Sequence, residues 1–131
     1  MKIKYYCLFL LLASALTSCG QSFKGRTVIG KKLAENQVKE ALAGKYAKSY
    51  YNTKERKTDI DTKEKAIKFA EAITFKIYGE EQIKSEKPYE CYLINGFWYV
   101  SGTLPENYRG GCFEIIFNAK DSRIIRLTHY K

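Results

Sequence analysis

Two stretches of the chain carry apolar residues at helical spacing, and the rest of the pattern is that of strands and loops. Over residues 33–51 the apolar positions are Ala34, Val38, Ala41 and Leu42. Intervals of three and four residues place these side chains along one side of a helix, so we expect a helix that packs on a core. Polar and charged residues fill 52–60, which predicts a loop.

The next stretch predicts a better-defined helix. Asp61 stands three positions before Glu64, which is the spacing of an N-terminal capping box. Gly79 has the backbone freedom that commonly ends a helix. Between these signals the apolar stripe is formed by Ala66, Phe69, Ala70, Ile73 and Ile77. A short helical turn over 80–84 follows, and Pro88 ends it.

After Pro88 the apolar positions alternate, which is typical of β-strands. Residues 89–94 and 97–104 flank Asn95-Gly96, a pair that favours the type I′ turn of a two-residue hairpin. Such a turn sets the register of the two strands. It places Ile94 opposite Phe97 and Cys91 opposite Val100.

A second hairpin is predicted over 112–118 and 123–130. Sequential strands usually neighbour one another, so we expect a four-stranded antiparallel sheet. Helices followed by strands indicate the α+β class, with N-terminal helices packed on the sheet. In this order Cys91 and Cys112 lie two strands apart, roughly 9 to 10 Å. Because a disulfide does not span that distance, we expect two reduced, buried thiols.

The two faces of the first hairpin differ in character. One face carries Cys91, Leu93, Trp98 and Val100. The other carries Glu90, Tyr92, Ile94, Phe97, Tyr99 and Ser101. The first face holds no charge, so we expect it to pack on the helices and the second to be more exposed.

An aromatic cluster on the second face is the first candidate for partner binding. It consists of Tyr92, Ile94, Phe97 and Tyr99. Aromatic side chains with polar tips are favoured at the centres of interfaces. Alternatively, the N-terminal helix or the loop over 102–111 covers the cluster, which then belongs to the core. Tyr108 and Arg109, on that glycine-flanked loop, form a second candidate contact.

Charge separates the chain into two parts. The 131 residues are 45% hydrophobic and 28% charged, the profile of one globular domain. The formal net charge of +9 is uneven, because residues 20–57 hold ten basic residues against three acidic ones, whereas 58–131 hold eleven of each. The excess lies outside the half with the clearest fold, and this disfavours nucleic-acid binding.

Residues 1–18 have the pattern of an export signal, with Lys2 and Lys4 before an apolar run. That run has about 12 residues, whereas a helix needs roughly 20 to span a bilayer. Leu16-Thr17-Ser18-Cys19 resembles the bacterial lipobox, which implies that Cys19 is lipidated and that the protein is anchored in the cell envelope. The alternative is a secreted protein with a plain thiol at Cys19.

Residues 19–32 contain three glycines and show no clear period. We expect a flexible basic tether with a reach of about 20 Å, whose charge adds attraction to an anionic surface. The remainder, 33–131, is expected to form a single α+β domain.

The sequence shows no catalytic or metal-binding constellation. His129 is the only histidine, so zinc and haem motifs are absent and we expect no cofactor. Glu114 and His129 are candidates for a pocket acid and base. Strand alternation explains Glu114 and a surface position explains His129 without any chemistry, so we expect a protein that is not an enzyme.

Several motifs together resemble one bacterial family. They are Tyr78-Gly79-Glu80, Lys87-Pro88, Leu93-Ile94-Asn95-Gly96, Trp98-Tyr99-Val100, Gly102-Thr103-Leu104-Pro105 and Gly110-Gly111-Cys112-Phe113. Over about residues 62–131 the chain resembles immunity proteins with a nuclear transport factor two-like fold, found in polymorphic toxin systems. The resemblance implies a cone formed by a curved sheet around helices, and neutralisation of a cognate toxin. Asp121-Ser122 departs from the Asp-Gly turn expected of that family.

We therefore expect a lipid-anchored, non-enzymatic immunity protein that occludes a cognate toxin. Two alternatives remain open. One is an envelope lipoprotein whose cone pocket binds a small apolar ligand or has weak isomerase-like activity. The other is a structural lipoprotein that self-associates, for example as a homodimer, through the aromatic face.

Overall fold

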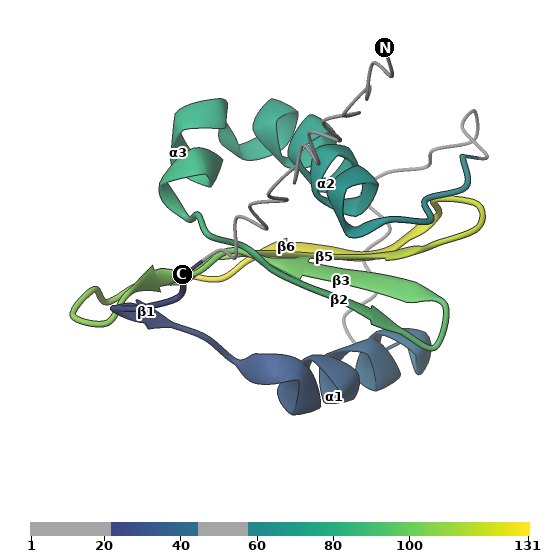
Figure 1. Ribbon diagram of the computed structural model, residues 1–131, viewed down its shortest axis with the longest axis horizontal. Coiled ribbons are helices and arrows are strands. Elements are labelled where there is room, and N and C mark those ends of the chain that lie inside the picture. The colour runs from purple at the N-terminus through teal and green to yellow at the C-terminus, as the bar shows by residue number, and fades with distance from the viewer. Residues whose placement is uncertain (1–21, 45–57) are drawn as a thin grey trace, which may run out of the picture.

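The computed structural model describes residues 22–44 and 58–131 of the chain. It contains a four-stranded antiparallel sheet with helices on both faces (Figure 1). The elements are β1 (Arg26–Thr27), α1 (Gly30–Leu42), α2 (Lys63–Tyr78), α3 (Glu80–Ser85), β2 (Glu90–Ile94), β3 (Phe97–Ser101), β4 (Leu104–Pro105), β5 (Phe113–Asn118) and β6 (Ile124–His129). The predicted α+β class is confirmed. The predicted export signal over 1–18, the lipidation of Cys19 and most of the 52–60 loop lie outside the described residues.

The sheet has the strand order β2-β3-β5-β6, as the hairpin pattern predicted. In the first hairpin Ile94 pairs with Phe97 and Cys91 with Val100, so the predicted register is confirmed. Asn95 and Gly96 both have positive φ, at 49° and 81°, which a type I′ turn requires. Ser122 also has a positive φ of 57°, so this turn adopts the backbone conformation that glycine tolerates best.

The main core lies between the sheet and α2. The first face of the hairpin contributes Cys91, Trp98 and Val100 to this core, as expected. Leu93, on edge strand β2, is half-exposed instead. On α2 the buried apolar residues are Ala66, Ala70 and Ile73. Ile77 continues the predicted stripe but is 42% exposed, whereas its neighbour Tyr78 packs against the core cluster.

The N-terminus of α2 differs from the predicted capping box by one position. Thr62, rather than Asp61, is the capping residue, and its hydroxyl accepts a hydrogen bond from the backbone N–H of Lys65 at 3.2 Å. Asp61 forms an ion pair with the Lys65 ammonium at 2.6 Å. The helix ends as predicted, since the N–H of Gly79 donates to the carbonyl of Phe75.

Helix α1 lies on the opposite face of the sheet from α2 and α3 (Figure 1). It begins at Gly30, three residues earlier than predicted, and ends at Leu42. The expectation of a flexible tether is corrected for residues 22–32, because Arg26–Thr27 forms β1 and pairs with β4. This ordering depends on contacts that are remote in sequence, because the Arg26 guanidinium donates to the Thr103 carbonyl at 2.6 Å and to its hydroxyl at 3.0 Å.

Cys91 and Cys112 are free thiols, as the strand separation predicted. Cys91 is buried, and burial raises the pKa of its thiol to about 12. Cys112 is only partly buried, in contrast to our expectation. Burial also raises the pKa of Cys112.

Candidate partner-binding site

The aromatic cluster predicted to bind a partner lies underneath α1. Ile94 and Tyr99 are 5% and 1% exposed, and they pack with Ala34, Val38 and Ala41 of the helix. Tyr92 and Phe97 are partly buried against the same cluster. The expectation of an exposed face is therefore corrected, and the alternative of a covering N-terminal helix describes this surface. The alternative of self-association through the aromatic face is not supported, because α1 covers that face.

A buried carboxylate ties α1 to this face. Both oxygens of Glu90 accept hydrogen bonds at the helix N-terminus, from the backbone N–H groups of Ile29 at 2.9 Å and Gly30 at 2.8 Å. The hydroxyl of Tyr92 donates to the same carboxylate at 3.0 Å. Burial and the adjacent Glu90 charge raise the pKa of Tyr92 to about 12.

Glu114, the candidate pocket acid, is bound to other side chains on the α1 face. It is 2% exposed, accepts a hydrogen bond from the Tyr99 hydroxyl at 3.0 Å and pairs with the Arg126 guanidinium at 3.2 Å. Arg126 in turn donates to the Gln37 side chain of α1 at 2.6 Å. The tyrosine and guanidinium contacts make Glu114 part of the packing between the sheet and α1.

His129, the candidate base, lies on the opposite face of the sheet from Glu114. In the β5–β6 pairing His129 stands opposite Phe113, whereas Glu114 stands opposite Thr128. Because side chains alternate along a strand, the structure does not bring the two candidates together. The alternation of side chains along the two predicted strands was sufficient to place Glu114 and His129 on opposite faces.

Both ring nitrogens of His129 have partners within the fold. Nε2 lies 2.7 Å from a carboxylate oxygen of Glu86, and Nδ1 lies 2.9 Å from the carbonyl oxygen of Tyr130. Glu86 is fully buried and also accepts from the backbone N–H of Phe113 at 2.8 Å. Sequence reasoning missed Glu86, because a helical turn does not reveal that its carboxylate reaches β5 and β6.

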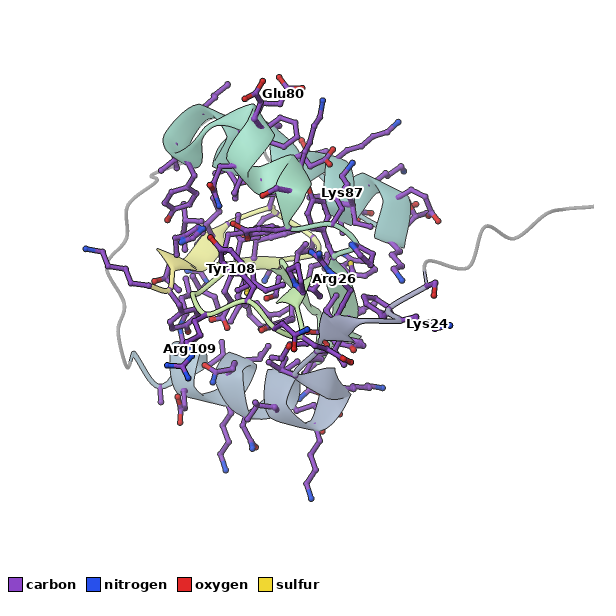
Figure 2. The ribbon with its side chains drawn as sticks, turned by 90° about the vertical axis from the view of Figure 1, so that its left-hand side faces the viewer. Lys24, Arg26, Glu80, Lys87, Tyr108 and Arg109 are labelled. Atoms are coloured by element: carbon purple, nitrogen blue, oxygen red, sulfur yellow. The ribbon has the colours of Figure 1, made fainter. Side chains whose placement is uncertain are left out.

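A groove of about 420 Å³ lies beside His129, at the end of the sheet. We call it the loop groove. It is lined by Gln82 and Ser85 from α3, by Leu104, Pro105 and residues 108–111 from the loop, and by residues 129–131. Figure 2 shows this side of the molecule with Tyr108 and Arg109 labelled. Both side chains are exposed, and Tyr108 is 64% exposed.

Close backbone approaches hold the base of this loop in place. A Cβ atom at Gly111 would lie 2.1 Å from the backbone of Tyr130, and one at Gly102 would lie 2.3 Å from the Glu86 carboxylate. Thr103 hydrogen-bonds through its hydroxyl to the carbonyl of Pro88 at 2.7 Å. These contacts give a physical reason for the glycines and for the threonine of Gly102-Thr103-Leu104-Pro105.

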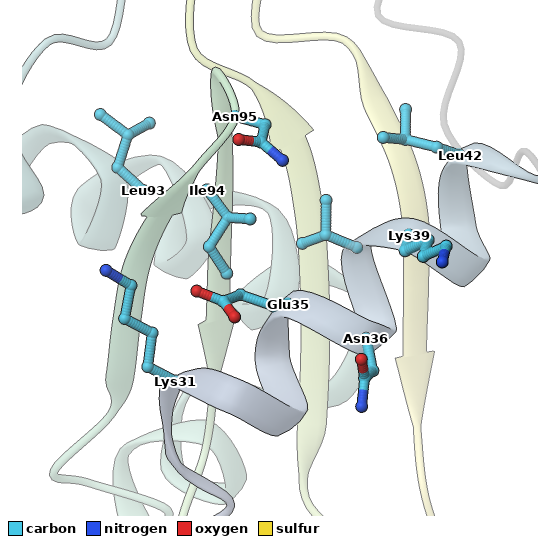
Figure 3. Close-up of a pocket in the computed structure, with 9 residues that line it drawn as sticks. Lys31, Glu35, Asn36, Lys39, Leu42, Leu93, Ile94 and Asn95 are labelled. Carbon is cyan, nitrogen blue, oxygen red and sulfur yellow. The ribbon is translucent and has the colours of Figure 1, made fainter.

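A second groove, also of about 420 Å³, lies between α1 and the turn of the first hairpin. We call it the helix groove. In Figure 3, Lys31 and Glu35 reach from α1 toward the strand that carries Leu93 and Ile94. The helix groove is therefore lined by both basic and acidic side chains.

Residues 22–44 and 58–131 contain no group of three or more His, Cys, Asp or Glu side chains that could hold a metal ion. They also contain no helix that is long and apolar enough to cross a membrane.

Comparison with known proteins agrees with this fold. Residues 65–131 match the family described as NTF2 fold immunity protein, and the chain belongs to that family. It is also similar to the uncharacterized protein YhhH of Escherichia coli (strain K12), with 33% identity over 73 residues. That alignment covers 55% of this chain and 58% of YhhH, so the chain matches less than two thirds of its relative's length. No solved structure matches the chain at a significant level.

Proposed function

We propose that the protein neutralises a cognate protein toxin by binding it through the loop groove, without a cofactor and without catalysing a reaction. The observation that carries this proposal is the position of the groove within the family match. All residues that line the loop groove fall within 65–131, the segment that matches the NTF2 fold immunity proteins. The helix groove depends on α1, which lies outside that segment.

The contacts of Glu114 and His129 support a binding role. Glu114 is buried in a pair with Arg126, and the His129 ring is held between Glu86 and Tyr130. A general acid or base must reach a substrate proton, and these two groups already have partners in the fold. Tyr108 instead offers an exposed aromatic ring, a type of residue that often dominates interface energies.

We also propose that Cys19 is lipidated and holds the domain at a bacterial envelope membrane. The support is the lipobox-like sequence that ends at Cys19, behind the apolar run. Ser22, where the described structure begins, is three residues further along, which corresponds to about 10 Å of fully extended chain. A toxin bound by this protein would therefore be held close to the membrane surface.

Co-expression with the neighbouring open reading frames tests the immunity role. We expect one of their products to be toxic in the envelope and to be neutralised by the full chain. Tyr108→Ala combined with Arg109→Ala is expected to abolish neutralisation. Leu93→Ala is the matched control, since Leu93 is half-exposed at the helix groove. The proposal fails if none of the products is relieved by this protein. Full neutralisation by the double variant would move the site away from the loop groove.

Mass spectrometry of the N-terminal peptide from envelope fractions tests the anchor. We expect an acylated Cys19 in the wild-type protein, and release of the Cys19→Ser variant from the membrane fraction. An unmodified Cys19 in the mature protein would disprove lipidation without affecting the proposed toxin binding.

A further inference from the structure

The loop groove carries positive charge that no side chain in its lining balances. Arg109 and Lys131 are among its lining residues, and none of the lining residues is Asp or Glu. Two buried carboxylates contact lining residues, and both have partners within the fold. Glu86 is bonded to His129 and to the backbone N–H of Phe113, and Glu114 is paired with Arg126. The helix groove differs, because Glu35 lies there with Lys31 and Lys39.

The two cations are also available for an incoming group. Within residues 22–44 and 58–131, the side chains of Arg109 and Lys131 form no ion pair or hydrogen bond, and both residues are exposed. Other lysines at this end are paired, Lys84 with Glu80 and Lys87 with Glu71. A guanidinium without a partner can bind a carboxylate through two parallel hydrogen bonds.

Aromatic and apolar side chains complete the surface. Tyr108 and Tyr130 are 64% and 46% exposed, and the groove also includes Leu104 and Pro105. The hydroxyl of Tyr130 lies 3.4 Å from Glu114, a contact that restricts the ring. Tyrosine and arginine next to each other are typical of residues that contribute most to interface affinity. A partner that fits this surface needs both a carboxylate and an apolar side chain beside it.

We propose that the loop groove receives an acidic segment of the toxin, in which a carboxylate binds Arg109 and Lys131 and a neighbouring apolar side chain packs on Tyr108 and Tyr130. This inference rests on the proposed function, since it specifies the chemistry of the partner at the same site. Charge complementarity of this kind raises the association rate and excludes partners that are basic at this point.

Charge reversal in the full chain tests the inference, with the toxin that co-expression identifies as the binding partner. Affinity is measured for the wild-type protein, for Arg109→Glu with Lys131→Glu, and for Lys120→Glu. Lys120 is an exposed lysine in the β5–β6 turn, outside the loop groove. We expect the double reversal to weaken binding by on the order of 100-fold at low salt and the control by less than about 3-fold. Thermal unfolding of each variant verifies that the fold is retained.

Charge reversals in the toxin provide a second test of the inference. Reversing the acidic residues of the toxin one at a time should identify one that restores binding to the Arg109→Glu, Lys131→Glu protein. Wild-type affinity should also fall as the salt concentration rises. Unchanged affinity of the double reversal would overturn the acidic-segment inference while toxin neutralisation stands. Failure of the wild-type protein to bind any toxin would overturn the proposed function itself.

Discussion

The carboxylate of Glu90 accepts a hydrogen bond from the backbone N–H of Gly30 at 2.8 Å, across 60 positions of the sequence. Gly30 begins α1, where backbone N–H groups have no partners within the helix and the helix dipole is positive. The helix has no side-chain cap of its own and no acidic residue in its first turn. Glu90 on β2 therefore supplies the negative group that the N-terminus of α1 lacks.

Glu90→Ala is expected to loosen α1 from the sheet. Removal of the carboxylate leaves the N–H groups of Ile29 and Gly30 and the Tyr92 hydroxyl without this acceptor, and we expect a loss of about 1–3 kcal/mol in the free energy of unfolding. Backbone hydrogen exchange in α1 should be faster in Glu90→Ala than in the wild-type protein, whereas exchange in α2 should change less. Glu106→Ala, at an exposed position, is the control. Equal protection of α1 in wild type and Glu90→Ala would contradict this role.

The Glu114–Arg126 pair should be strongly coupled. Both side chains are 3% exposed, so Arg126→Met leaves a carboxylate buried without its cation, at a cost of about 3–5 kcal/mol. We expect Glu114→Gln with Arg126→Met to cost less than the sum of the two single variants, as measured by urea unfolding. Lys65→Met provides the comparison, because it breaks an exposed pair with Asp61 and should change stability little. Additive losses would show that the two side chains act independently.

Stability should fall at alkaline pH, and Tyr99 should contribute to the fall. Burial and the Glu114 charge raise the pKa of the Tyr99 hydroxyl. In the unfolded chain a tyrosine loses its proton near pH 10. Above that pH the unfolded state releases the proton and the folded state keeps it, so the stabilisation present below pH 10 is lost as pH rises toward the folded-state pKa.

Tyr99→Phe isolates this contribution. The variant should be less stable than wild type by about 1 kcal/mol at neutral pH, because the hydrogen bond to Glu114 is lost. Above pH 10 its stability should fall less steeply, by up to about 1.4 kcal/mol per pH unit. Urea unfolding at a series of pH values measures both effects. Parallel curves for the two proteins would exclude Tyr99 as a source of the alkaline slope.

Cys91 should resist alkylation in the native protein. Its thiol is buried with a pKa of about 12, so at pH 8 it is almost entirely protonated, and the thiolate is the reactive form. Peptide mapping after iodoacetamide treatment should find Cys91 unmodified in the native protein and modified in guanidinium. Cys112, which is only partly buried, should react at an intermediate rate. A Cys91–Cys112 disulfide in the non-reduced peptide map would contradict the structure.

Local patterns were sufficient for much of the sheet. Asn95-Gly96 and the alternation on either side define the register of the first hairpin, because a two-residue turn leaves one possible pairing. The same alternation places Glu114 and His129 on opposite faces. At the candidate site, the exposure of Tyr108 and Arg109 agrees with their position on a glycine-flanked loop. The groove itself could not be predicted, because α3 and the C-terminal residues also line it and no local sequence pattern joins them to that loop.

By itself, the sequence determined the α+β class, the strand order and the register of the first hairpin, since these depend on turns and periodicities between neighbouring residues. Tertiary structure alone decided that α1 covers Tyr99 and Ile94, that Glu90 caps this helix, and that Glu86 reaches His129. The physical reason is that an amphipathic strand pattern shows which side chains share a face but not which distant element buries that face. That choice follows from contacts between residues about 40 to 90 positions apart.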